Sequence, residues 1–192
     1  MSRLVVSEFV TVDGVMEDPG GSEGFERGGW AFRFERGADG DKFKLDEVMG
    51  ADAQLLGRKT YEGFAAAWPG RDDEAGFAAK MNTMPKYVVS STLSSPEWQN
   101  TTVIDGDIVE EIKALKQRVD GDILVYGSAR LVRTMIDHGL VDELRLMVFP
   151  VVLGRGERLF ADDAQQSAFE LVETKQTGAV AILTLRPTTA DA

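Results

Sequence analysis

The chain has 192 residues, 43% hydrophobic and 28% charged, a balance typical of a folded globular protein and too apolar for a disordered one. Its 32 acidic residues outnumber 21 basic ones, and the net charge of -11 disfavours binding to nucleic acid or anionic membranes. The absence of Cys and the single His exclude disulfides, thiol nucleophiles and thiolate or His-rich metal sites, so we expect no metal. Polar residues interrupt the N-terminal apolar stretch, which therefore predicts neither a signal peptide nor a membrane span. We expect a cytoplasmic protein with a single domain over residues 1–192.

The N-terminal half predicts strands and helices separated by a long glycine-rich loop. Residues 3–12 alternate as a strand does and end at Asp13-Gly14, a turn signal. Residues 17–41 are rich in Gly and charge but contain Phe25, Trp30, Phe32 and Phe34, so we expect this loop to cover a pocket. The elements expected next are a helix over 41–49, a buried strand over 53–57, a helix capped by Thr60, a short helix around Phe77 and Met81, and strands over 86–92 and 101–104.

The C-terminal half predicts parallel strands and then a hairpin. A helix over 108–119 precedes an apolar strand over 123–126, and a second helix stops at His138-Gly139, where His138 complements the helix dipole. A strand over 144–153 contains Pro150, which predicts an edge position or a bulge. Residues 169–174 and 179–186 form the expected hairpin. The whole pattern predicts an α/β fold with parallel neighbouring strands and antiparallel strands at the C-terminus.

Three segments place small, hydroxyl or cationic residues directly after an apolar strand. They are Gly57-Arg58-Lys59-Thr60, Ser90-Ser91-Thr92, and the run from Gly127 through Ser128, Ala129 and Arg130 to Leu131. Free N–H groups at a helix start bind phosphate, and small residues let a ligand approach the backbone. Each segment alone also fits a plainer role, such as a capped helix with solvated cations. Together, at the strand ends of an open sheet, they predict one elongated phosphorylated ligand.

Two superficially similar motifs do not support this prediction further. The segment ending in Lys59-Thr60 lacks the glycines of a triphosphate-binding loop at the required spacing. Gly154-Arg155-Gly156 lacks the third glycine of a dinucleotide fingerprint, so we interpret it as a tight turn.

Six motifs follow one another along nearly the whole chain. They are Val12-Asp13-Gly14, Leu56 to Glu62, Pro85 to Ser90, Gly127 to Val132, Gly139 to Leu144 and Phe149 to Gly154. In this order they resemble the dihydrofolate reductase-like superfamily, and most closely the RibD C-terminal branch, the reductase domain of riboflavin biosynthesis. The resemblance implies a three-layer fold, with a mixed, mostly parallel central sheet flanked by helices, and a homodimer. It also implies NADPH as cofactor and hydride transfer to a pteridine- or pyrimidine-like heterocycle or a related carbonyl or imine.

The resemblance also assigns roles to individual residues. It implies that Phe9, Val10 and Met16 lie near the nicotinamide, and that Gly57, Arg58, Lys59 and Thr60 meet the adenosine-side phosphates. It places Ser90, Ser91 and Thr92 at the 2'-phosphate, and Gly127, Ser128, Ala129, Arg130 and Leu131 around the diphosphate. Folate reductases carry a cis Gly-Gly peptide where this chain has Gly127-Ser128.

The proton donor is left open between two carboxylates. Asp41 lies at about the same distance before Gly57 as the family's carboxylate does. Trp30 resembles the loop Trp that precedes this carboxylate in the family. The resemblance therefore implies that both residues contact the substrate. Asp41 also fits a helix cap, and its rival Asp13 also fits a plain Asp-Gly turn. Without Cys, the zinc deaminase chemistry of bifunctional riboflavin enzymes is excluded. True dihydrofolate reductase activity and a non-catalytic nucleotide-binding module are the alternatives.

Overall fold

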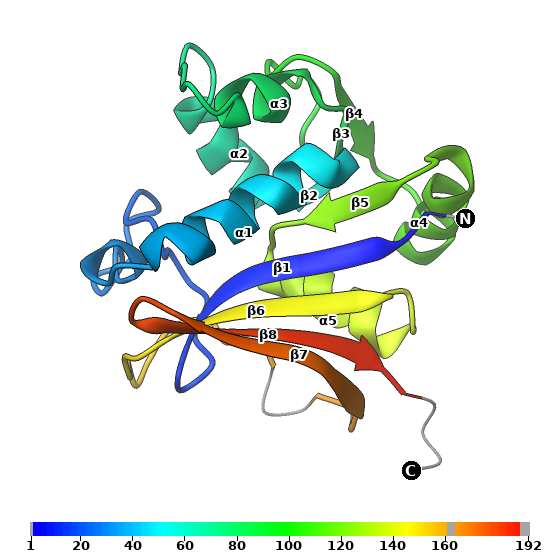
Figure 1. Cartoon of the computed structure of the whole chain (residues 1–192). Helices are drawn as coiled ribbons and strands as arrows, with labels where there is room; N and C mark the ends of the chain where they lie inside the picture. The colour runs from blue at the N-terminus through cyan, green and yellow to red at the C-terminus, as the bar shows by residue number, and fades with distance from the viewer. Residues whose placement is uncertain (1, 161–163, 189–192) are drawn as a thin grey trace.

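A computed structural model describes residues 2–160 and 164–188 of the chain. Its centre is an eight-stranded sheet in the order β4-β3-β2-β5-β1-β6-β8-β7 (Figure 1). The strands from β4 to β6 in this order run parallel, whereas β8 is antiparallel to β6 and β7 is antiparallel to β8. The expected mixed sheet with an antiparallel C-terminal hairpin is therefore confirmed.

The bounds of the elements follow the expected order along the chain. The strands are β1 (Leu4–Thr11), β2 (Ala51–Gly57), β3 (Lys86–Val89), β4 (Thr101–Ile104), β5 (Asp122–Val125), β6 (Glu143–Phe149), β7 (Phe169–Thr177) and β8 (Val180–Pro187). The helices are η1 (Ala31–Arg33), α1 (Gly37–Gly50), α2 (Arg58–Ala67), α3 (Phe77–Thr83), α4 (Ile108–Arg118) and α5 (Ala129–Asp137). Within these described residues, every helix falls short of the length and apolarity needed to cross a membrane.

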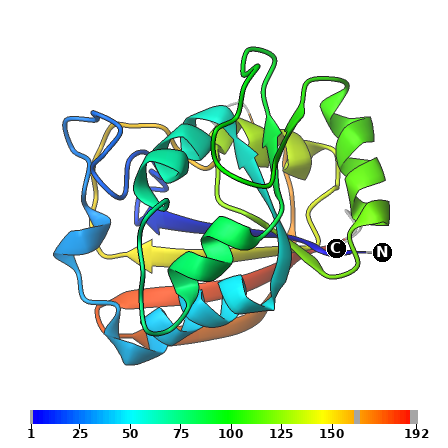
Figure 2. The same ribbon diagram turned by 90° about the horizontal axis from the view of Figure 1, so that it is seen from above.

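Helices cover both faces of the parallel part of the sheet, which gives the expected three layers. Helices α1, α2 and α3 lie on one face, as the view from above shows (Figure 2). Val5 of β1 packs toward that face, in a cluster with Val48 of α1 and Met81 of α3. Because side chains alternate along a strand, Leu4 and Val6 point to the opposite face.

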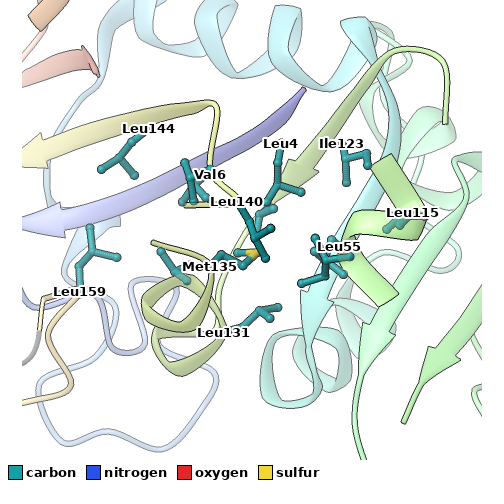
Figure 3. Packing of buried hydrophobic residues seen from close by; sticks show 14 of the residues in the cluster. Leu4, Val6, Leu55, Leu115, Ile123, Leu131, Met135, Leu140, Leu144 and Leu159 are labelled. Atoms are coloured by element: carbon teal, nitrogen blue, oxygen red, sulfur yellow. The ribbon is translucent and has the colours of Figure 1, made fainter. Parts of the chain in front are cut away.

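The second face is covered by α4 and α5 and holds the largest cluster of buried side chains. In Figure 3, Met135 of α5 lies on the side of the helix that faces Leu4 and Val6 of β1, and Leu131 extends toward Leu55 of β2. Leu115 of α4 closes the cluster at the side. These side chains are at most 5% exposed. Burial of this apolar area is the main favourable term that holds the layers together.

Helix α1 begins earlier than the sequence predicts, and this changes the position of Asp41. The predicted helix starts at Asp41, but α1 starts at Gly37, so Asp41 lies inside the helix and does not cap it. Two glycines at the start weaken the sequence signal because Gly is a poor helix former. The structure uses Gly40 for close packing, since a Cβ there would lie 3.1 Å from Cγ2 of Thr177.

Two other local predictions were wrong. Gly57 is the N-cap residue of α2 and Thr60 lies in the first turn, so Thr60 does not cap the helix. Strand β6 is an interior strand between β1 and β8, and it ends at Phe149, immediately before Pro150. Pro150 therefore indicates the end of the strand, where a missing N–H costs no ladder hydrogen bond.

Candidate functional site

The three predicted ligand-binding segments lie together at the carboxyl ends of neighbouring parallel strands. Gly57, the last residue of β2, pairs with Val89 of β3, and Leu55 pairs with Val125 of β5. The N–H of Gly57 donates to the carbonyl of Gly127 at 3.0 Å, so the turns after β2 and β5 are in direct contact. The Arg58 guanidinium donates to the hydroxyl of Thr92, which joins the turn after β3. We call residues 57–60, 90–92 and 127–131 the strand-end rim.

Glycine allows the two central turns of the rim to meet. A Cβ at Gly57 would lie 2.4 Å from Oγ of Ser128, and one at Gly127 would lie 2.9 Å from Oγ1 of Thr60. Gly127 also has φ +78°, a backbone conformation that favours glycine. The peptide bond between Gly127 and Ser128 is cis, as is the Gly-Gly peptide of folate reductases at this place.

Two helices begin at the rim with no side chain capping their N-termini. Gly57 has no side chain to cap α2, and the Ser128 side chain makes no cap hydrogen bond to α5. Elsewhere, Asp107 accepts from two N–H groups of α4, and Asp73 accepts from the N–H groups at the start of α3. The difference matters because uncapped N–H groups and the positive end of the helix dipole favour a bound anion. The rim thus has two adjacent helix starts suited to phosphate.

The cations of the rim are held close to carboxylates. Arg58 pairs with Glu62 of its own helix at 2.6 Å. Lys59 lies 2.9 Å from Glu23 and 3.7 Å from Glu17, both in the glycine-rich loop. The hydrogen bond that Lys59 donates to the Glu23 carboxylate raises the pKa of Lys59 above its ordinary value. Arg130, in the first turn of α5, is exposed. A phosphate at the rim would meet these cations and compete with their carboxylates.

Several predicted binding residues hold the rim rather than face a ligand. The Ser90 hydroxyl accepts from the N–H groups of Thr92 and Leu93, at 3.2 and 3.0 Å, and so shapes the turn after β3. Ser91 and Thr92 are exposed. The side chains of Val10 and Leu131 are buried in the hydrophobic core. Among the hydroxyls of this turn, those of Ser91 and Thr92 are the ones available to a ligand.

A cavity of about 460 Å³ opens beside β1, between α1 and the end of the glycine-rich loop. Its lining consists of Phe9, Ala31, Phe32, Phe34, Glu35, Arg36, Gly37, Ala38 and Asp41. Two cations flank the Phe9 ring, with Arg36 5.6 Å and Lys44 5.2 Å from its centroid. Asp41 is 64% exposed and pairs with Arg36 at 2.7 Å. The expectation that the loop covers a pocket is confirmed for residues 31–36.

Trp30 and Asp13, also predicted at the site, are absent from the described lining of this cavity. Trp30 is fully buried beneath the loop, and its indole N–H donates to the Glu17 carbonyl at 2.8 Å. The Asp13 carboxylate accepts from the N–H of Gly154 at 2.7 Å and thereby joins two turns. Burial works to raise the pKa of Asp13, but the Thr11 hydroxyl and the N–H groups of Gly154 and Leu153 hold it below the usual value. A carboxylate stabilised in its ionised form is a poor proton donor.

One buried acid beside the rim was missed by the sequence reasoning. Glu8 of β1 is 7% exposed, and its Oε1 has no hydrogen-bond partner among the described residues. Burial raises the pKa of Glu8 to about 8, although the charge of Lys44 and the Gly127 backbone oppose the shift. The signal was present in the sequence, because Glu8 falls on the same face of the predicted strand as the apolar residues Leu4, Val6 and Val10.

Comparison with known proteins agrees with this architecture. A putative riboflavin biosynthesis protein from Shewanella sp. PV-4 matches with a TM-score of 0.75 at 17% identity, over 97% of this chain and 99% of that one. Dihydrofolate reductase from Enterococcus faecalis, complexed with NADP(H), matches with a TM-score of 0.57 at 16% identity, over 97% of both chains. The fold is therefore that of the dihydrofolate reductase-like class.

The family follows from the sequence comparisons. The family model of the RibD C-terminal domain matches residues 3–183, and the chain belongs to this family. The uncharacterized protein YyaP of Bacillus subtilis (strain 168) is 33% identical over 176 residues, covering 90% of this chain and 88% of YyaP. The diaminohydroxyphosphoribosylaminopyrimidine deaminase/5-amino-6-(5-phosphoribosylamino)uracil reductase of Thermotoga maritima matches with a TM-score of 0.63 at 17% identity, over 97% of this chain and 57% of that one.

Proposed function

We propose that this chain is an NADPH-dependent reductase that transfers a hydride to a small planar heterocycle of pteridine or pyrimidine type, or to a related carbonyl or imine. The observation that carries the proposal is the junction of Gly57 and Gly127, where two uncapped helix starts adjoin. Such a pair of helix starts suits a diphosphate. Membership of the RibD C-terminal family and the NADP(H) bound by the Enterococcus reductase support the choice of cofactor.

The residues of the rim fit such a cofactor. Gly57 and Gly127 let the two turns approach each other closely, and Thr60 and Ser128 add hydroxyls at the junction. In the proposal, the starts of α2 and α5 with Arg130 hold the diphosphate, and Arg58, Ser91 and Thr92 hold the 2'-phosphate. Phe9 and Met16 border the nicotinamide ring. When bound, NADPH supplies the hydride.

The acceptor belongs in the cavity beside Phe9. A volume of about 460 Å³ suits a bicyclic heterocycle, and Phe9 and Phe34 offer ring faces and edges against which it can pack. Arg36 and Asp41, paired at 2.7 Å, offer a donor and an acceptor for the polar edge of such a ring. Asp41, directly or through water, would relay the proton that follows the hydride.

The first test is direct titration of the purified protein with NADPH, monitored by quenching of tryptophan fluorescence. Trp30 lies beneath the loop that borders the cavity, which makes the signal sensitive to events there. The proposal expects saturable quenching at micromolar NADPH, with weaker binding of NADH. Absence of quenching at near-millimolar NADPH would overturn it.

Stopped-flow absorbance at the NADPH band then identifies the acceptor. A panel should include dihydrofolate, reduced and oxidised pteridines, and 5-amino-uracils with and without a ribosyl phosphate. Turnover with dihydrofolate would identify a true dihydrofolate reductase. Binding of NADPH without oxidation across the whole panel would favour a non-catalytic nucleotide-binding module.

We also propose that the chain forms a homodimer, as the family resemblance implies. Strand β7 lies at the edge of the sheet and exposes Leu171 by 54% and Val172 by 42%. An exposed apolar edge strand is a common pairing surface. Light scattering after size exclusion should give twice the chain mass, and a monomer at micromolar concentration would contradict the proposal.

A further inference from the structure

Glu8 is a buried acid that the proposed function has not used. It lies on β1 one residue before Phe9, so the two side chains point to opposite faces of the sheet. While Phe9 lines the cavity, Glu8 points toward the turn after β5, and its Oε1 lies 3.8 Å from where a Cβ on Gly127 would stand. A buried carboxyl oxygen without a partner costs free energy, and this one lies beside the rim.

Three side chains converge on Gly127 from three different elements. The position of a Cβ on Gly127 is 2.9 Å from Oγ1 of Thr60, 3.7 Å from Cε of Met16 and 3.8 Å from Oε1 of Glu8. Met16 is half-buried and comes from the chain that follows β1. Its unbranched thioether side chain can change rotamer at small cost. A ring that displaces the end of Met16 would meet the unpartnered oxygen of Glu8.

The charges around Glu8 come chiefly from the opposite face of the sheet. Lys44 and Glu47 of α1 act on it in opposite directions, and these two residues pair with each other at 2.7 Å. Tyr126, which follows β5, is the third titratable group coupled to Glu8, and burial raises its pKa well above the ordinary value. Because Lys44 is already engaged by Glu47 and by the Ser7 hydroxyl, it does not pair directly with Glu8.

We propose that Glu8 is a cofactor-binding residue that, as the neutral acid, donates a hydrogen bond to the carboxamide oxygen of the nicotinamide ring. This inference rests on the proposed function and names the residue by which the site distinguishes the two redox states of the cofactor. Reduced nicotinamide is uncharged and accepts a hydrogen bond from a neutral acid without electrostatic cost. The oxidised ring carries a positive charge and favours the carboxylate form of the same residue.

The two redox forms of the cofactor should therefore respond to pH in opposite directions. Burial places the pKa of Glu8 at about 8, so NADPH, which needs the protonated form, binds about tenfold more weakly at pH 9 than at pH 7. NADP⁺ gains affinity over the same range, because its binding favours the deprotonated form of Glu8. Binding of NADP⁺ at pH 7 also releases a proton, because the positive ring lowers the pKa of Glu8.

The experiment measures the affinity of the whole protein for NADPH and for NADP⁺ between pH 6.5 and 9.5, by fluorescence and by calorimetry in two buffers. Glu8→Gln keeps a hydrogen-bond donor that does not titrate, so its NADPH affinity stays close to wild type at pH 6.5 and no longer falls toward pH 9. Glu8→Leu has no donor and binds NADPH about tenfold more weakly at pH 6.5. Calorimetry detects proton release on NADP⁺ binding in the wild type and not in Glu8→Gln.

Tyr126→Phe is the matched control. Tyr126 is another group whose buried oxygen has no partner among the described residues, but it lies on the α1 face of the sheet, against the cluster around Val5. Its variant retains the wild-type pH dependence of both affinities. If the affinities for NADPH and NADP⁺ changed with pH in parallel, or if Glu8→Gln kept the wild-type dependence of affinity on pH, this inference would be overturned and the proposed function would stand. Failure of the wild type to bind either cofactor would overturn the proposed function, and the inference with it.

Discussion

Gly57 donates its backbone N–H to the carbonyl oxygen of Gly127 at 3.0 Å. The two residues belong to turns that follow neighbouring strands, β2 and β5, and each turn leads directly into a helix. Neither position has room for a side chain, because Ser128 stands against the first and Thr60 against the second. One contact between two glycines thus sets the spacing of two helix N-termini, and with it the spacing of the proposed phosphate contacts.

Gly57→Ala should separate these helix starts. The new Cβ would lie 2.4 Å from Oγ of Ser128 and 2.8 Å from the Ser128 backbone nitrogen, so the backbone must move and rotation of a side chain is not enough. We expect NADPH affinity to fall at least tenfold, and the free energy of unfolding to fall by about 1–3 kcal/mol, the usual cost of overpacking. Fluorescence titration and urea denaturation measure the two effects.

Gly63→Ala is the control for this substitution. Gly63 lies in α2, six residues further along, and a Cβ there meets nothing within 4 Å. Because Ala is a better helix former than Gly, the free energy of unfolding of this variant should rise by about 0.5–1 kcal/mol. Its affinity for NADPH should equal that of the wild type. Equal effects of the two substitutions would show that the junction has no special role.

Arg58→Ala should weaken NADPH more than NADH. Arg58 contacts Thr92 across the rim and is the cation nearest the turn after β3, where the 2'-phosphate is proposed to lie. Because a charge-assisted contact is lost, the affinity for NADPH should fall roughly tenfold or more, whereas the affinity for NADH should fall less than threefold. Lys113→Ala, which removes an exposed cation paired with Glu110 on α4, should change neither affinity. Equal losses for both cofactors would remove Arg58 from the 2'-phosphate site.

Ser91→Ala tests the other half of the same assignment. Ser91 is exposed in the turn after β3, whereas the neighbouring Ser90 hydroxyl is engaged by two backbone N–H groups. The loss of affinity for NADPH should again exceed the loss of affinity for NADH, by a few-fold, because one neutral hydrogen bond contributes about 1 kcal/mol. A calorimetric titration that finds equal affinities for wild type and variant would place the 2'-phosphate elsewhere.

Asp41→Asn should lower turnover with little effect on the cofactor. Asp41 lines the cavity and not the rim, so NADPH affinity should stay within about twofold while the rate of acceptor reduction falls 10²-fold or more, as expected for loss of a proton relay. Asp46→Asn is the matched control, since Asp46 is also exposed on α1 but pairs with Lys42 away from the cavity. An unchanged rate in Asp41→Asn would remove this carboxylate from the mechanism.

The fold was predictable from sequence because its signals are local and periodic. The inward positions of the first strand and of the helix over 108–119, together with the stop at His138-Gly139, are strong patterns that the structure reproduces. The misplaced elements lack such signals. Gly37 and Gly40 lower helix propensity, and their helical placement depends on Thr177 and Gly178, more than a hundred residues away. A single sequence cannot show that contact.

The candidate site was predictable in part for the same reason. The ends of β2, β3 and β5 carry recognisable small and hydroxyl residues, and parallel pairing brings them together. Which side chains face outward was not predictable, because it depends on packing. Trp30 and Leu131 are buried, Ser90 is engaged by its own turn, and Glu8 is left without a partner at its Oε1 among the described residues.

The buried state of Glu8 also predicts how stability depends on pH. Its pKa is about 8 in the folded chain against an ordinary 4.5, so between these values the folded state binds more protons than the unfolded state. In this range Glu8 stays protonated in the folded core but ionises when the chain unfolds. Ionisation stabilises the unfolded chain more as the pH rises. The free energy of unfolding of the wild type, relative to Glu8→Gln, should therefore fall as pH rises from 5 to 8, by at most about 1.4 kcal/mol per pH unit, and level off above 8.

Urea denaturation of both proteins at half-unit intervals from pH 5 to 9 gives this difference directly, and taking the difference cancels the contribution of the other carboxylates. Tyr126→Phe supplies the reference for a buried polar group that does not titrate in this range, because the pKa of Tyr126 is raised. The difference in free energy of unfolding between wild type and Tyr126→Phe should be constant with pH. If the difference between wild type and Glu8→Gln were equally constant, Glu8 would not be protonated in the folded chain, and it could not donate the hydrogen bond proposed for it.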